Sequence, residues 1–140
     1  MNLQPIVLIT GATKGIGKAI ADRFAESSAE LHVVARSSED LEAMKVSLER
    51  PGMTVRTYVS DLSVAEEVKE LVGVLRSNLK KLDVLVNNAG IYLPGSLLEE
   101  DSNNLPYMMQ LNVLCHYDIT RGLADLMVPV IYMVPIMQIF

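Results

Sequence analysis

The chain has 140 residues, of which 50% are hydrophobic and 21% are charged, and its formal net charge is −5. This is one domain's worth of chain with enough apolar side chains for a core, which excludes a disordered or low-complexity protein. The acidic balance excludes the electrostatic footprint of a nucleic-acid-binding protein. The single cysteine, Cys115, cannot form an internal disulfide, and no Lys or Arg precedes the first apolar run. We therefore expect a cytoplasmic protein without a signal peptide.

Four short runs predict strands, and the first of them is continuously apolar, as strands buried on both faces of a parallel sheet are. They occupy residues 6–10, 31–35, 55–59 and 84–86. Between them, apolar side chains recur at helical spacing.

The predicted helices follow each strand in turn. The first runs from about Ile16 to Ser27. The second starts at the hydroxyls and acids of 37–40 and stops at 51–52, and the third covers 64–75 behind a capping-box pattern, Ser63-x-x-Glu66. A longer helix is expected from about Asn104 to Met127. Strands that alternate with helices imply right-handed crossovers and a parallel sheet covered by helices.

A glycine-rich turn, Gly11-x-x-x-Gly15-x-Gly17, stands between the first strand and the first helix. Such a turn lets the backbone approach a pyrophosphate without Cβ atoms and presents helix N-terminal N–H groups to its charge. A tight loop with glycines at turn positions is the simpler interpretation of the glycines alone. The flanking strand and helix favour dinucleotide binding.

The segment Thr10-Gly11-Ala12-Thr13-Lys14-Gly15-Ile16-Gly17 resembles the T-G-x-x-x-G-x-G signature of the short-chain dehydrogenase/reductase family. Three further motifs follow in the family's order: Asp61-Leu62, Asn87-Asn88-Ala89-Gly90, and Asn112 in Leu111-Asn112-Val113. The resemblance covers residues 6 to about 127, roughly half of a usual member. It implies an α/β fold with a Rossmann-like, doubly wound parallel sheet in three α/β/α layers, incomplete at the C-terminus. We assign 1–127 to this NADP-binding domain.

The resemblance also implies roles for particular residues. Asp61-Leu62 would contact the adenine, and Asn112 would be the catalytic-helix asparagine. The expected cofactor-binding residues are Gly11, Thr13, Lys14, Gly15, Ile16, Gly17, Arg36, Asp61, Leu62, Asn87, Ala89 and Gly90. The family commonly packs the Asn112 helix between subunits, so we also expect a homo-oligomer through this helix.

The residues at the end of the second strand indicate whether the chain prefers NADP or NAD. An acidic side chain there would bind the ribose 2′-OH and repel a 2′-phosphate, but this chain has Ala35-Arg36. A guanidinium binds phosphate at two points, and Lys14 could add a second positive charge. Both could instead be ordinary surface charges. Their combination favours NADP(H) over NAD(H).

The family's Tyr-x-x-x-Lys pair is not found in the 140 residues. The lysine would lower the tyrosine pKa for acid–base work near neutral pH. The residues four places after Tyr58, Tyr92, Tyr107, Tyr117 and Tyr132 are Leu, Ser, Leu, Arg and Ile. Of the implied catalytic residues only Asn112 is present, and by the family's spacing the serine, tyrosine and lysine would fall at or beyond residue 140. Asn112 could alternatively be a capping or surface amide.

Two histidines, His32 and His116, have no partners at metal-ligand spacing, so we expect no metal site. Cys115 has no neighbouring base in the sequence and is expected to be a packed residue.

An apolar run covers residues 126–137, and from about Val128 the chain departs from the family's pattern, so we set residues 128–140 apart as an atypical apolar tail. It is too short for a membrane span, and Pro129 and Pro135 interrupt it. Three explanations remain open: a truncated or frame-shifted product, a replacement fifth strand, and a segment that binds a partner or a membrane surface.

Three functions are open at this point. The first is an NADP(H)-dependent oxidoreductase that transfers hydride between the cofactor and a small carbonyl or alcohol substrate. The second is a non-catalytic nucleotide-binding module, or a remnant that needs a partner. The third is an interaction protein that merely retains the fold.

Overall fold

The sheet of this protein is parallel and has four strands in the described residues. The computed structural model describes residues 4–127. Strands β1 (Ile6–Thr10), β2 (Glu30–Ala35), β3 (Val55–Val59) and β4 (Val84–Val86) lie in the order β3-β2-β1-β4. All pairs are parallel, with Val7 opposite both Leu31 and Val84. The predicted strand positions are confirmed, with β2 starting one residue earlier.

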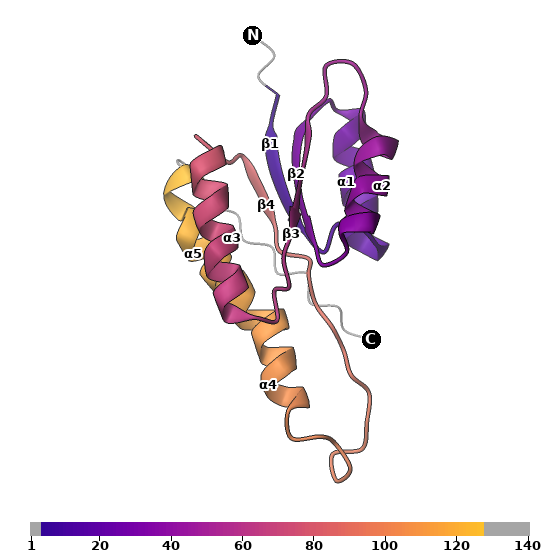
Figure 1. Cartoon of the computed structure of the whole chain (residues 1–140), viewed down its shortest axis with the longest axis vertical. Coiled ribbons are helices and arrows are strands. Elements are labelled where there is room, and N and C mark those ends of the chain that lie inside the picture. The colour runs from indigo at the N-terminus through magenta and orange to yellow at the C-terminus, as the bar shows by residue number, and fades with distance from the viewer. Residues whose placement is uncertain (1–3, 128–140) are drawn as a thin grey trace.

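Helices cover both faces of the sheet, which makes three layers (Figure 1). Helices α1 (Gly15–Glu26) and α2 (Ser38–Leu48) pack on one face around a core that includes Val7, Ile9 and Val33. Helix α3 (Ala65–Asn78) and the C-terminal helices pack on the other face. The predicted doubly wound, Rossmann-like α/β class is confirmed, because the sequential order runs outward from β1 in both directions.

The stretch predicted as one long helix is helical throughout but not uniform. It consists of α4 (Asn104–Met109), a π-helical turn (Gln110–Leu114), α5 (Cys115–Leu123) and a final 3₁₀ turn (Ala124–Met127). The π-helical turn inserts extra backbone into the helix, a feature often found at functional sites. It falls on the segment that carries Asn112.

The predicted start of α2 is confirmed. Helix α3 starts at Ala65, one residue after the predicted Val64, but the predicted capping box Ser63-x-x-Glu66 is wrong. Ser37 Oγ accepts a hydrogen bond from the Asp40 amide at 3.0 Å and so caps α2. Ser63 makes no such cap, because its hydroxyl donates to Asp61 Oδ1 at 2.6 Å. Glu67 rather than Glu66 reaches back and accepts the Asp61 amide at 2.7 Å. The nearby carboxylate outcompetes the helix amides for the serine hydroxyl.

The apolar segment at 128–140, for which the sequence leaves three explanations open, lies outside the described residues. Within residues 4–127, no helix is long and apolar enough to cross a membrane.

Candidate functional site: a glycine turn and a cleft at the carboxyl ends of the strands

The glycine turn joins β1 to α1 through two left-handed residues. Gly11 has φ +63° and Gly15 has φ +54°, conformations that residues with a Cβ rarely adopt. A Cβ on Gly15 would meet nothing within 4 Å, so the backbone there faces open space. A Cβ on Gly17 would collide with the Gly11 carbonyl and the Asn88 side chain. Gly15 therefore leaves room for a ligand, and Gly17 lets the helix pack closely on the turn.

The turn is tied to the end of β4 by Thr10 and Asn88, both buried. Asn88 Nδ2 donates to the carbonyl oxygens of Thr10 (3.1 Å) and Gly11 (3.0 Å). Thr10 Oγ1 in turn accepts the backbone amides of Asn88 and Ala89, each at 3.0 Å. This reciprocal set of bonds holds the glycine turn and the Asn87–Gly90 segment side by side.

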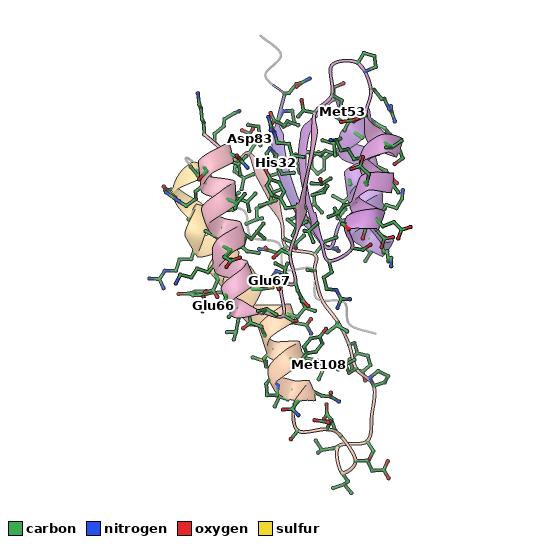
Figure 2. All side chains as sticks on the ribbon, viewed as in Figure 1. His32, Met53, Glu66, Glu67, Asp83 and Met108 are labelled. Carbon is green, nitrogen blue, oxygen red and sulfur yellow. The ribbon has the colours of Figure 1, made fainter. Side chains whose placement is uncertain are left out.

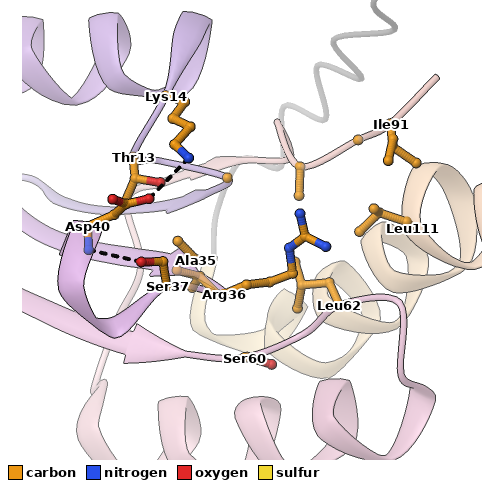
Figure 3. Close-up of a pocket in the computed structure, with 14 residues that line it drawn as sticks. Thr13, Lys14, Ala35, Arg36, Ser37, Asp40, Ser60, Leu62, Ile91 and Leu111 are labelled. Carbon is orange, nitrogen blue, oxygen red and sulfur yellow. Dashed lines mark hydrogen bonds and ion pairs between the residues drawn. The ribbon is translucent and has the colours of Figure 1, made fainter. Parts of the chain in front are cut away.

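A cleft of about 530 Å³ opens between these two segments and the end of β2 (Figure 3). Seven of the predicted cofactor residues line it: Gly11, Thr13, Lys14, Arg36, Leu62, Ala89 and Gly90. Sequence motifs that lie far apart in the chain thus meet at the carboxyl ends of the strands, where open α/β sheets bind ligands.

The other predicted cofactor residues do not line the cleft. Gly15, Ile16 and Gly17 lie in the first turn of α1, and Asp61 and Asn87 each directly precede another residue of their motif, Leu62 or Asn88. Asn87 Nδ2 donates to Thr120 Oγ1 at 3.0 Å, which ties the end of β4 to α5.

Asp61 is engaged within its own loop. Its Oδ1 accepts hydrogen bonds from the amide and the hydroxyl of Ser63. Burial raises the pKa of the Asp61 carboxyl, but these bonds and the nearby positive charge of Arg36 outweigh burial and lower it below its usual value. Asp61 therefore stays ionised and fixes the loop that carries Leu62.

Two basic side chains stand at the cleft. The Lys14 ammonium forms an ion pair with Asp40 at 3.2 Å. Arg36 extends into the cleft in Figure 3 and forms no ion pair with any residue of 4–127. The positive charge of Arg36 is thus available to an anionic ligand, while that of Lys14 is shared.

Asn112 lies beside the cleft rather than in it. Its Oδ1 accepts the Ile91 amide and its Nδ2 donates to the Ile91 carbonyl, both at 2.7 Å. His116, one turn later, donates from Nε2 to the Ala89 carbonyl at 2.7 Å. The two side chains clamp the backbone of the segment that lines the cleft.

Cys115 is fully buried, as expected of a packed residue, and burial raises the pKa of its thiol to about 12. In the π-helical turn the Cys115 amide bonds to the Gln110 carbonyl, and the thiol donates to the Leu111 carbonyl at 3.1 Å. The side chain thus replaces the helical hydrogen bond that the turn displaces. No three His, Cys, Asp or Glu side chains gather as a metal site within residues 4–127.

The site fits a dinucleotide on two observations. Helix α1 begins at Gly15 with no side-chain cap and no acid in its first turn, so its amide groups are open to a phosphate. Ser60 lines the cleft, is 4% exposed, and its Oγ has no hydrogen-bond partner among the described residues. A buried hydroxyl without a partner costs free energy unless a ligand or water satisfies it.

Sequence reasoning did not single out Thr10, Asn88, Ser60 or Asp40 as site residues. Thr10 and Asn88 belong to the quoted motifs, and their place within those motifs was the available signal. Ser60 directly precedes the Asp61-Leu62 motif. Asp40 was interpreted only as an acid at a helix start, and nothing in the sequence places it against Lys14.

Comparison with known proteins decides the family. A family model described as short chain dehydrogenase matches residues 5–131. The chain belongs to this family.

Similar proteins include sepiapterin reductase of Chlorobaculum tepidum, 32% identical over 132 residues, which cover 89% of this chain and 54% of the relative. Among solved structures, L-sorbose reductase from Gluconobacter frateurii, complexed with NADPH and L-sorbose, is 32% identical. It aligns with a TM-score of 0.82 over 89% of this chain and 48% of its own. An alcohol dehydrogenase from Thermococcus sibiricus, complexed with 5-hydroxy-NADP, is 30% identical, with TM-score 0.82 over 89% and 53%. The chain spans about half the length of the relatives it matches.

Proposed function

We propose that this short-chain dehydrogenase binds NADP(H) in the cleft and serves as the cofactor-binding part of an oxidoreductase. The reaction would transfer hydride between NADP(H) and a small carbonyl or alcohol substrate. The observation that carries the proposal is the open, uncapped N-terminus of α1 at Gly15, beside a cleft into which Arg36 extends.

The preference for NADP(H) over NAD(H) rests on the charges at the end of β2. Ala35 leaves space where an acid would repel a 2′-phosphate, and both Arg36 and Lys14 line the cleft. A guanidinium that forms no ion pair within residues 4–127 can give a charge-assisted, two-point contact to a phosphate. The NADPH and 5-hydroxy-NADP named for the two structural neighbours agree with this choice.

The test compares Arg36→Asp with the unchanged protein in equilibrium titrations of NADPH and NADH, followed by cofactor fluorescence. We expect NADPH binding to weaken about tenfold or more, because one charge-assisted contact contributes about 1.5–3 kcal/mol. NADH binding should not weaken, because a carboxylate at this place can accept a hydrogen bond from the ribose 2′-OH. Arg50→Asp makes the same charge change in the loop after α2, outside the cleft, and should change neither affinity. An unchanged preference for NADPH in Arg36→Asp would overturn the assignment.

Asn112 is proposed to take part in the reaction by holding the Ile91 backbone at the cleft wall. Turnover is tested by NADPH oxidation with a panel of small ketones, in the unchanged protein and in Asn112→Ala. Turnover that Asn112→Ala abolishes supports the oxidoreductase. Cofactor binding without turnover would instead favour the nucleotide-binding module, a function compatible with 140 residues that contain no Tyr-x-x-x-Lys pair.

The helical stretch that carries Asn112 is also proposed as the contact between two copies of this chain in the cytoplasm. Apolar side chains spaced four residues apart are exposed along it: Leu105, Met109, Val113 and Tyr117. Such a stripe on a helix is typical of an interaction surface rather than of a solvated face.

A further inference from the structure

Asp40 lines the cleft together with Lys14 and Arg36, the two basic residues that the proposed function assigns to the cofactor. It belongs to the first turn of α2, its side chain is 39% exposed, and it lines the same cleft as Lys14 and Arg36. Figure 3 shows its carboxylate against the Lys14 ammonium. A carboxylate at this place both neutralises Lys14 and repels a phosphate.

We propose that Asp40 is a specificity-determining residue that competes with the 2′-phosphate of NADP(H) for Lys14 and so limits the preference over NAD(H). The inference deepens the proposed function and rests on it. The Lys14 ammonium forms an ion pair with Asp40 at 3.2 Å, so a 2′-phosphate must share or displace that ion pair. NADH carries no 2′-phosphate, so its binding does not require the Lys14–Asp40 ion pair to be shared or displaced.

Two effects of Asp40 oppose each other. The ion pair orients Lys14 toward the cleft, but a pair this exposed, with the Lys14 side chain 82% accessible, contributes little orientation energy. The repulsion acts on a phosphate monoester, which carries about −1.5 to −2 charges at neutral pH. A phosphate that contacts Lys14 would come close to the Asp40 carboxylate, which lies 3.2 Å from the Lys14 ammonium, and its nearly double charge makes the repulsion the larger effect. Removing the Asp40 charge should therefore strengthen NADPH binding.

The substitution Asp40→Asn removes the charge and keeps the shape. We expect NADPH to bind about three- to tenfold more tightly at low salt, with NADH changed less than about twofold. The gain should shrink at about 0.5 M salt, where charges are screened within a few ångströms. Both affinities are measured by equilibrium titration with the full chain.

Glu39→Gln is the matched control. Glu39 lies in the same first turn of α2, is exposed, and does not line the cleft. It therefore tests whether any loss of negative charge at this helix end has the same effect. We expect Glu39→Gln to change NADPH binding less than about twofold. An equal gain in Glu39→Gln would overturn the proposal, because the effect would then be that of net charge.

Asp40→Asn in a Lys14→Gln background separates competition from simple repulsion. If Asp40 acts by competing for Lys14, less than half of the gain should remain there, and a full gain would overturn the competition. A weaker or unchanged NADPH affinity in Asp40→Asn alone would also overturn it. The proposed function would instead be refuted if the unchanged protein did not bind NADPH. It would also be refuted if Arg36→Asp did not weaken NADPH binding.

Discussion

Replacing Thr10 by valine tests the bonds that hold the glycine turn to β4. Thr10 is 0% exposed, and valine has nearly its shape, so the change removes a hydroxyl without opening a cavity. The hydroxyl accepts the amides of Asn88 and Ala89, each at 3.0 Å. Asn88 keeps a second acceptor, the Val86 carbonyl at 3.1 Å, whereas no other acceptor of the Ala89 amide is found in residues 4–127. One amide is left unpaired and one is weakened.

An unpaired amide costs about 1–3 kcal/mol, so we expect Thr10→Val to lower the free energy of unfolding by about 2 kcal/mol. This is a large part of the 5–15 kcal/mol or so that stabilises a typical domain. The measurement is urea unfolding followed by far-ultraviolet circular dichroism. The midpoint should fall while the slope stays constant, because the surface exposed on unfolding is the same.

The control is Thr57→Val in β3, a partly buried threonine whose hydroxyl makes no hydrogen bond with the described residues. It should change the free energy of unfolding by less than about 0.5 kcal/mol. If Thr10→Val were as harmless as Thr57→Val, the Thr10 hydroxyl would not be the structural link that the geometry indicates.

Two further predictions concern the helical face and the response to pH. Val113→Lys should convert a dimer to a monomer, as measured by light scattering after gel filtration. Leu97→Lys, on the exposed loop, should leave the dimer intact. If the unchanged protein is monomeric, the proposed contact is refuted. Burial lowers the pKa of His32 despite its hydrogen bond to Glu30, so the folded state binds fewer protons than the unfolded one between the folded pKa and the ordinary histidine pKa of about 6.5. The stability contributed by neutral His32 is therefore present above that pH and lost as the pH falls through the folded pKa. His32→Gln should flatten the decline in unfolding free energy between about pH 7 and pH 5, and a slope equal to that of the unchanged protein would contradict this.

The interior position of His32 illustrates what the sequence could not supply. The spacing of His32 in the sequence indicates that it has no metal-binding partner. The spacing does not indicate which side chains surround it. In the structure its side chain is fully buried, with Nδ1 2.8 Å from the Tyr58 hydroxyl and Nε2 3.1 Å from Glu30 Oε1. Figure 2 labels His32 among the side chains of the sheet. The neighbours come from β2 and β3, which pair in register with His32 opposite Arg56. Strand pairing, not local pattern, determines them.

The strands themselves were predictable for a simple reason. A strand buried on both faces must be apolar along its whole length, so the runs at 6–10 and 84–86 carry their signal locally. The contact between these two strands cannot be predicted from the local sequence. Thr10 and Asn88 are 78 residues apart, and their bonds require β1 and β4 to be neighbours in the order β3-β2-β1-β4. The family resemblance identified the segments, while the sheet order explains why they act together.

Asn112 shows the same limit at the scale of one helix. Helical periodicity predicts a regular helix from 104 to 127 and places Asn112 on it, but periodicity contains no sign of the π-helical turn at Gln110–Leu114. Within that turn the Asn112 amide pairs with both polar groups of Ile91, at 2.7 Å each. These two bonds occupy one oxygen lone pair and one N–H of the amide, so the side chain first fixes the backbone of the cleft wall. Any contribution of Asn112 to hydride transfer would therefore depend on that fixed wall, and Asn112→Ala should loosen the cleft even where no substrate is present.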